Sequence, residues 1–205
     1  MKNIIIIGSP GAGKGTQIER LTSHFHFDVI SGSEIAKELM MNNPRIKEAI
    51  NNGELISDEV MINEVAKRVP LVDKDKGIIF DGFPRTIAQS RSLEPIIQKS
   101  GRDLDAVIYL FLDEEVAIDR LSKRKICEVC GRSIEPGLDA CMQCGGSVAH
   151  RQDDSPNVVL SRIETFLEKT IPIVRYYKNR GLLVEINADQ SIEDVTKDIL
   201  RRINH

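Results

Sequence analysis

A glycine-rich loop between a buried strand and a helix constrains this chain more than any other feature. Residues 3–7 (NIIII) are typical of a strand covered on both faces in a parallel sheet, and residues 14–25 have the apolar spacing of a helix. Between them, residues 8–16 read GSPGAGKGT. Glycines allow backbone N–H groups to surround phosphate oxygens, the helix N-terminus adds partial positive charge, and Lys14 can reach the β- and γ-phosphates. The loop therefore predicts a triphosphate site made by Gly11, Ala12, Gly13, Lys14, Gly15 and Thr16.

The rest of the chain alternates apolar strands with helices. Further buried strands are expected at residues 77–81, 106–112 and 182–186, and helices at residues 87–99, 114–125, 156–180 and 192–203. This alternation predicts an α/β fold, a three-layer sandwich around a central parallel sheet. Residues 31–69 are mostly helical in pattern, and residues 126–151 are rich in Cys and Gly. We interpret both stretches as insertions at the carboxyl ends of strands, where open α/β sheets bind ligands.

The loop departs from the general phosphate-loop pattern at one position that bears on magnesium. That pattern has Ser or Thr directly after the lysine, whereas this chain has Gly15. A magnesium ion must then be held through water and a carboxylate elsewhere, which suits an ion that keeps much of its water. Asp81, at the end of the strand expected at residues 77–81, is the predicted magnesium residue.

Two Cys-x-x-Cys pairs form the second chemical signature. Each pair can bind one side of a tetrahedral metal, so four thiolates predict a closed structural Zn²⁺ site. Its ligands would be Cys127, Cys130, Cys141 and Cys144. Iron in a rubredoxin-like site and unligated thiols are the alternatives. The segment has little apolar sequence of its own, so a metal would supply the order that a core cannot.

Composition and charge indicate which classes of partner the chain binds and in which cellular compartment it works. The formal net charge of -3, the pI near 5.9 and the 4% aromatic content argue against a nucleic-acid binder. No apolar stretch is long enough to cross a membrane, and the first apolar run is too short for a signal peptide. We expect a cytoplasmic monomer that binds neither nucleic acid nor membrane, with its cysteines reduced and free to bind metal.

Five motifs in order along the chain resemble the adenylate kinases, within the nucleoside monophosphate kinases. The loop matches GxPGxGKGT, and residues 81–86 match DGFPRT, with Gln89 at the spacing of an adenine-reading glutamine. Residues 119–124 are similar to the DRLxxR segment before the lid. Residues 151–154 are similar to the RxDD at the exit from the lid, with Arg162 further along.

The resemblance implies the reaction ATP + AMP ⇌ 2 ADP with Mg²⁺. It also implies a core of residues 1–29, 57–122 and 155–205, a monophosphate-binding flap at residues 30–56, and a zinc-binding lid at residues 123–154. Closure of the lid would exclude water and complete the site. We further hypothesise that lid motion limits turnover, which a large rate change on sulfur substitution at the transferring phosphate would contradict.

Phosphoryl transfer needs positioning and charge stabilisation more than covalent chemistry, and cations supply both. By resemblance the catalytic residues are Lys14, Arg85, Arg124, Arg151 and Arg162, with Arg120 and Arg124 against the donor triphosphate. The residues implied for AMP are Gly32, Lys37, Ile56, Gly82, Arg85, Gln89, Arg151 and Arg162.

The acceptor segment departs from the family pattern at two positions. Where the family reads STGDxxR, this chain has Gly32 for the threonine and Lys37 for the arginine. Losing a bidentate contact while keeping the charge should cost about 1–2 kcal/mol, which is roughly a ten- to thirty-fold higher KM for AMP. AMP stays the expected acceptor because Gln89 favours adenine. The alternatives are a kinase for UMP, CMP or GMP, a zinc-ribbon nucleic-acid-binding module, and a nucleotide-binding regulator without turnover.

Overall fold

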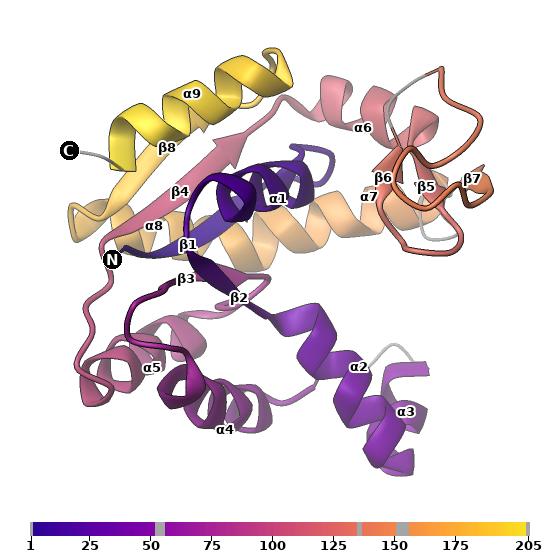
Figure 1. Ribbon diagram of the computed structural model, residues 1–205. Helices are drawn as coiled ribbons and strands as arrows, with labels where there is room; N and C mark the ends of the chain where they lie inside the picture. Colours follow the sequence, from indigo (N-terminus) through magenta and orange to yellow (C-terminus); the bar gives the residue numbers. More distant parts are fainter. Residues whose placement is uncertain (1, 52–55, 135–136, 151–155, 204–205) are drawn as a thin grey trace.

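A five-stranded parallel sheet forms the centre of the molecule in the computed structural model, which describes residues 2–51, 56–134, 137–150 and 156–203 (Figure 1). Its strands are β1 (Asn3–Gly8), β2 (Phe27–Ser31), β3 (Gly77–Asp81), β4 (Ala106–Phe111) and β8 (Leu183–Asn187), in the order β2-β3-β1-β4-β8. This confirms the predicted fold class. Strand β2 was absent from the expected strands because it lies at the sheet edge, where Val29 is exposed and the apolar run is broken.

Helices cover both faces of the sheet, and alternation along β1 divides the core between them. Ile4 and Ile6 pack with helices α1 (Lys14–His24), α6 (Glu114–Lys123) and α9 (Ile192–Ile203). Ile5 and Ile7 pack with helices α4 (Asp58–Arg68), α5 (Ile87–Lys99) and α8 (Ile171–Asn179). Each fully buried isoleucine contributes about 1.5–3 kcal/mol, so a strand buried on both faces is well determined by its sequence.

The helix expected at residues 156–180 is built in three parts. Helix α7 (Pro156–Thr165) runs into a π-helical turn, η3 (Phe166–Thr170), and continues as α8. A π turn is uncommon and is found most often at functional sites. Here it adds a residue to the helix where the helix passes the carboxyl edge of the sheet.

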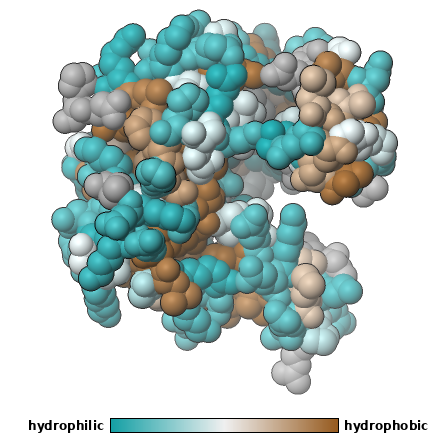
Figure 2. Space-filling model, in the orientation of Figure 1, coloured by the Kyte–Doolittle hydropathy of each residue, from teal (hydrophilic) through white to brown (hydrophobic). Residues whose placement is uncertain are grey.

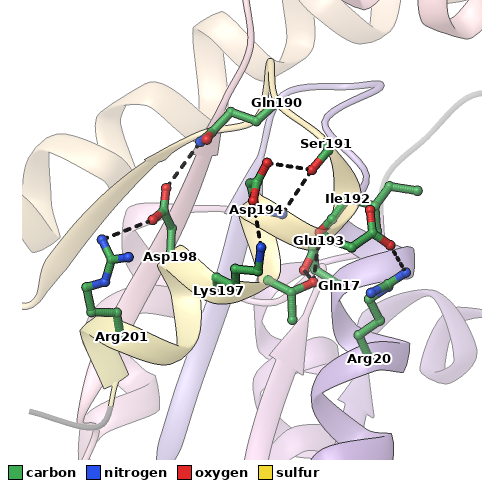
Figure 3. Close-up of polar contacts among 11 residues, drawn as sticks. Gln17, Arg20, Gln190, Ser191, Ile192, Glu193, Asp194, Lys197, Asp198 and Arg201 are labelled. Carbon is green, nitrogen blue, oxygen red and sulfur yellow. Dashed lines mark hydrogen bonds and ion pairs between the residues drawn. The ribbon is translucent and has the colours of Figure 1, made fainter.

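Two helices begin at a serine whose hydroxyl caps the first turn. The Ser31 hydroxyl accepts from the Glu34 N–H at 3.4 Å and begins α2 (Gly32–Asn42). The Ser191 hydroxyl accepts from the Asp194 N–H at 3.1 Å and donates to the Asp194 carboxylate at 2.8 Å, which begins α9 (Figure 3). Such caps satisfy backbone donors that the first helical turn leaves without partners.

Polar contacts join α9 to α1, the helix that follows the glycine-rich loop (Figure 3). The Gln17 amide donates to the Ile192 carbonyl at 3.0 Å and accepts from the Thr196 hydroxyl at 2.8 Å. Arg20 and Glu193 form an ion pair at 2.6 Å on the outer side of the same contact. Because Gln17 and Thr196 are buried, these bonds set the position of α1 and therefore of the loop at its N-terminus.

The two insertions extend from the same side of the molecule (Figure 1). The first carries α2 and α3 (Pro44–Asn51), and the second carries a small antiparallel sheet of β5 (Lys125–Cys127), β6 (Ser133–Ile134) and β7 (Val148–His150), in the order β6-β5-β7. Figure 2 shows the surface hollowed between them. The 3-10 turn η1 (Val69–Leu71) follows α4. Within the described ranges, the helices are too short or too polar to cross a membrane.

Candidate active site

The glycine-rich loop follows β1 and curves so that α1 begins at its end. Gly11 and Gly13 have φ angles of 81° and 80°, which is the left-handed region where a side chain is strained. Gly13 is the residue directly before α1, so the free N–H groups of the helix face the loop. The Lys14 ammonium lies inside the loop and donates to the Gly8 carbonyl at 2.8 Å. Helix N–H groups and an ammonium gathered at one loop are suited to bind phosphate.

Electrostatics around Lys14 favour an anion. Burial lowers the pKa of Lys14 to about 8, and the charge of Asp81 opposes that shift while Arg162, Arg85 and Arg124 add to it. Burial also raises the pKa of Asp81, opposed by the charges of Lys14 and Arg85. Among the described residues, several cations thus act on one buried ammonium, and Asp81 is the carboxylate that opposes them. A polyphosphate would satisfy this excess of positive charge.

Strand register brings Asp81 to the edge of the sheet where the loop lies. Asp81 pairs with Ile6 of β1 on one side and with Ser31 of β2 on the other. The chain leaves β1 for the loop and β2 for α2 within two residues of these pairs. The end of β3 therefore stands between the phosphate loop and the first insertion, as expected where the strand order reverses.

A cavity of about 440 Å³ opens between α2, α4, α5 and η3. The predicted acceptor residues that line it are Gly32, Ile56, Gly82, Arg85 and Gln89. Lys37 is not among its lining residues and is exposed on α2, and Arg151 lies outside the described residues. The first insertion thus contributes backbone and apolar surface to the cavity.

Gly32 is explained by close packing between the first insertion and the end of β3. A Cβ at this position would lie 2.5 Å from the Gly82 carbonyl oxygen, closer than such atoms approach. A side chain therefore has no room there unless α2 moves away from the loop that follows Asp81. The glycine allows the backbone of α2 to form one wall of the cavity.

A second cavity, of about 280 Å³, lies at the phosphate loop. Lys14 and Arg162 line it. It shares with the first cavity the residues Gly82, Arg85, Thr165 and Thr170. Arg85 therefore stands where the two cavities meet, with its Nε donating to the Gly82 carbonyl at 2.8 Å. Two phosphate-bearing molecules, one in each cavity, would meet at this guanidinium.

A third cavity, of about 660 Å³, lies between α1 and the second insertion. Gly15 and Thr16 line it from the loop, and residues 130–134 line it from the insertion. Arg132 forms an ion pair with Glu19 of α1 at 2.5 Å across this space. Arg120 points toward the segment after β8, where it donates to the Ala188 carbonyl at 2.9 Å and pairs with Asp189 at 3.2 Å.

The four cysteines come together as their spacing predicts. Their sulfur atoms all lie within 4.8 Å of one another, with Cys127 and Cys144 at 3.5 Å and Cys130 and Cys141 at 3.7 Å. Zinc–sulfur bonds of about 2.3 Å in a tetrahedron place neighbouring sulfurs about 3.8 Å apart, so the group fits Zn²⁺. The N–H groups of Cys144 and Gln143 lower the pKa of Cys141 to about 6, which favours the thiolate that a metal binds.

The comparisons with known proteins agree with this geometry. A family model described as adenylate kinase matches residues 6–182. The chain is 38% identical over 210 residues to an adenylate kinase of Caldicellulosiruptor saccharolyticus, covering 98% of each chain. It is 37% identical over 213 residues to adenylate kinases of Kosmotoga olearia and Staphylococcus epidermidis, covering 99% of each chain.

The chain belongs to the adenylate kinase family. This confirms the resemblance, the α/β phosphate-loop fold and the prediction of a phosphotransferase enzyme. Family membership also favours the prediction of a kinase over the alternative that the four cysteines belong to a zinc-ribbon nucleic-acid-binding module.

Several residues that line the first cavity are absent from the residues predicted from the sequence. Asp58 and Thr86 are hydrogen-bonded to each other and line the first cavity. Lys169 lines the same cavity from the π turn, and among the described residues no ion-pair partner is found for it. Thr86 could have been predicted, because it lies inside the DGFPRT motif. Asp58 and Lys169 belong to no motif in the sequence, and only the fold brings them to the cavity.

Proposed function

We propose that this chain transfers the γ-phosphoryl group of Mg-ATP to AMP and forms two molecules of ADP. The observation that carries the proposal is the junction of two cavities at Arg85, one at the phosphate loop and one bounded by Gln89. A donor and an acceptor held in these cavities present their phosphates to each other. The bond between the γ-phosphorus and its bridging oxygen breaks as an acceptor phosphate oxygen bonds to that phosphorus.

The donor occupies the loop and the third cavity. Residues Gly11 to Thr16 hold its phosphates through backbone N–H groups and Lys14, while the space between α1 and the second insertion receives its nucleoside. Arg120 and Arg124 lie on this side of the molecule, at the end of α6. Because both the loop and the second insertion line the third cavity, a donor bound there would be enclosed by both.

The acceptor occupies the first cavity. Its phosphate lies at Arg85 and its base at Gln89, with Gly32, Ile56 and Gly82 forming the walls. The acceptor phosphate is already an anion, so its attack requires no general base. Lys14, Arg85, Arg124 and Arg162 stabilise the charge that spreads over the transferring group, and we assign Arg151 the same role by family pattern.

Two metal ions complete the proposal. Mg²⁺ bound with ATP neutralises phosphate charge, and the Asp81 carboxylate at the end of β3 would hold it through water. Zn²⁺ would be held by the four cysteines as a structural ion. We assign residues 123–154 to a lid that closes over the donor and residues 30–56 to the acceptor flap. The core then comprises residues 1–29, 57–122 and 155–205, and the enzyme works as a cytoplasmic monomer.

A second candidate acceptor is another nucleoside monophosphate, favoured by Gly32 and Lys37. Neither residue offers the contact that the family pattern provides, so the acceptor base is read with fewer groups. A kinase for UMP, CMP or GMP would use the same donor site. AMP remains the proposed acceptor because the Gln89 amide lines the cavity.

The test is the rate of ADP formation from ATP with each of AMP, GMP, CMP and UMP. We expect the highest kcat/KM with AMP and loss of transfer when Mg²⁺ is removed. A clear preference for CMP or UMP would contradict AMP as the acceptor and leave the donor site intact. Absence of transfer with all four monophosphates would contradict the kinase itself.

A further inference from the structure

We propose that Asp58 determines the base specificity of the acceptor cavity by locking the side-chain amide of Gln89 in one orientation. The inference rests on the proposed function, in which Gln89 faces the acceptor base. Asp58 is the first residue of α4 and lies 31 residues before Gln89 in α5. Both side chains line the 440 Å³ cavity.

Two contacts of opposite kind fix the Gln89 amide. Its nitrogen donates to the Asp58 Oδ1 at 2.8 Å, and its oxygen accepts from the Arg85 backbone N–H at 2.7 Å. An ionised carboxylate only accepts hydrogen bonds and a backbone N–H only donates. A flipped amide would set two acceptors against each other on one side and two donors on the other. Because Gln89 is only 4% exposed, water cannot relieve that mismatch.

Asp58 is itself held in place by α5. The Thr86 hydroxyl donates to the Asp58 Oδ2 at 2.8 Å and accepts from the Gln89 N–H at 3.1 Å, where it caps the helix. The two carboxylate oxygens therefore have separate partners: Thr86 at the N-cap of α5 and Gln89 in the first turn of the same helix. The carboxylate is a fixed acceptor and not a mobile surface charge.

The locked amide retains one N–H and one oxygen lone pair for a ligand. The pairing edge of adenine offers an acceptor at N1 beside a donor at the 6-amino group. A 6-oxo purine reverses this order, with a donor at N1 beside an acceptor at O6. An amide that could flip would match both edges, whereas a locked amide matches one. Asp58 thus adds discrimination between the two purine classes, although it need not touch the base.

The substitution Asp58→Asn tests the lock with little change in shape. An asparagine amide can accept from or donate to Gln89, so it tolerates both orientations. The Arg85 N–H still opposes the flip, so we expect the preference for AMP over inosine monophosphate, as a ratio of kcat/KM values, to fall by roughly tenfold. Asp58→Ala should lower the same ratio. Glu59→Gln removes a carboxylate from the same helical turn, where it is exposed, and should leave the ratio unchanged.

A double-mutant cycle separates the lock from a merely structural effect. If Asp58 acts through Gln89, Asp58→Asn should change the preference in the native chain but not in a Gln89→Ala background. An unchanged ratio in Asp58→Asn and Asp58→Ala, or an equal change with and without Gln89, would overturn the inference. The native enzyme is measured first with ATP and AMP, since failure there would contradict the proposed function and not the lock.

Discussion

At the level of single residues, the phosphate loop encloses a lysine in surroundings that oppose its charge. Burial is the largest cause, and nearby guanidinium groups add to it, so the pKa of Lys14 falls to about 8. The negative charge of a bound polyphosphate would oppose this lowering and raise the pKa of Lys14 again. The charged form of Lys14 is therefore more stable when the donor is bound than when the loop is empty.

This environment predicts how donor binding depends on pH. Below about pH 8 the free protein carries Lys14 as the ammonium, which pairs with phosphate. Above that pH the free lysine is neutral and binding must take up a proton, so the affinity for Mg-ATP should fall by up to about tenfold per pH unit. Calorimetry at pH 7 to 10 in two buffers of different ionisation heat would measure both the affinity and the proton uptake. A Lys14→Met variant should bind more weakly and lose the step near pH 8, whereas an unchanged step would exclude Lys14 as its source.

Gly32 gives a second prediction at this scale. In Gly32→Ala the new Cβ would lie 2.5 Å from the Gly82 carbonyl oxygen, so α2 must shift. We expect unfolding in urea to require about 1–3 kcal/mol less free energy and the KM for AMP to rise. Gly15→Ala is the matched control for stability, because it is also a helical glycine and a Cβ there meets no atom within 4 Å. Equal stability of the two variants would show that α2 and the Gly82 carbonyl lie far enough apart in solution to admit a Cβ at position 32.

At the level of elements, the second insertion contacts the core through α1, the helix that follows the glycine-rich loop. The Arg132–Glu19 ion pair crosses from the start of β6 to α1, one turn beyond the phosphate loop. Glu19 and Arg132 keep 46% and 39% of their side-chain surface exposed, so the pair is weak and readily broken. Such a contact can favour the closed position of a lid without preventing its opening.

Removing this contact should weaken donor binding only slightly. An exposed ion pair contributes about 0.2–1 kcal/mol, so Arg132→Ala should raise the KM for ATP by roughly 1.5- to 5-fold and leave the KM for AMP unchanged. The effect should shrink at high salt because the pair is screened. Lys197→Ala breaks an ion pair within α9 and serves as the control. An equal rise in the KM for AMP would indicate that the substitution disturbs the acceptor site as well as the donor site.

At the level of the whole molecule, the described residues form one large core and a smaller part that lacks one. The two apolar clusters of the sheet contain residues from β1 to α9, but the described residues between 125 and 150 contribute to neither. The order of that segment depends on a three-stranded sheet and the four thiols. Loss of a metal should therefore unfold the small part and spare the large one.

Zinc removal tests this division. Structural zinc contributes about 10–16 kcal/mol to small apo-unfolded modules, far more than the short sheet can supply. Once a strong chelator has removed the zinc and excess Mg²⁺ has been restored, the KM for ATP should be higher and the thermal transition of the cysteine-bearing part should be lost, while AMP binding and the main transition persist. Scanning calorimetry with and without chelator measures both transitions, and re-addition of Zn²⁺ should restore the first. A single lowered transition, with AMP binding lost as well, would contradict an independent lid.

Sequence predicted the parts of the fold and site that depend on neighbours along the chain. The NIIII run, the glycine-rich loop and the helix after it are local patterns, and each formed as expected. Strand β2 escaped prediction because edge exposure removes the apolar run that identifies a buried strand. The π turn escaped because one extra residue in a helical ladder leaves no compositional trace.

By itself, then, the sequence determined the glycine-rich loop, the cysteine cluster and the family, because these need only residue types at fixed spacings within short motifs. Tertiary structure alone decided how the first cavity, the proposed acceptor site, is built. Asp58 meets Gln89 and Arg132 meets Glu19 only because the fold sets distant segments of the chain side by side. Gly32 is required by a backbone 50 residues further along the chain, at Gly82. Such contacts depend on distances below 3 Å between remote segments, and sequence spacing carries no information about them.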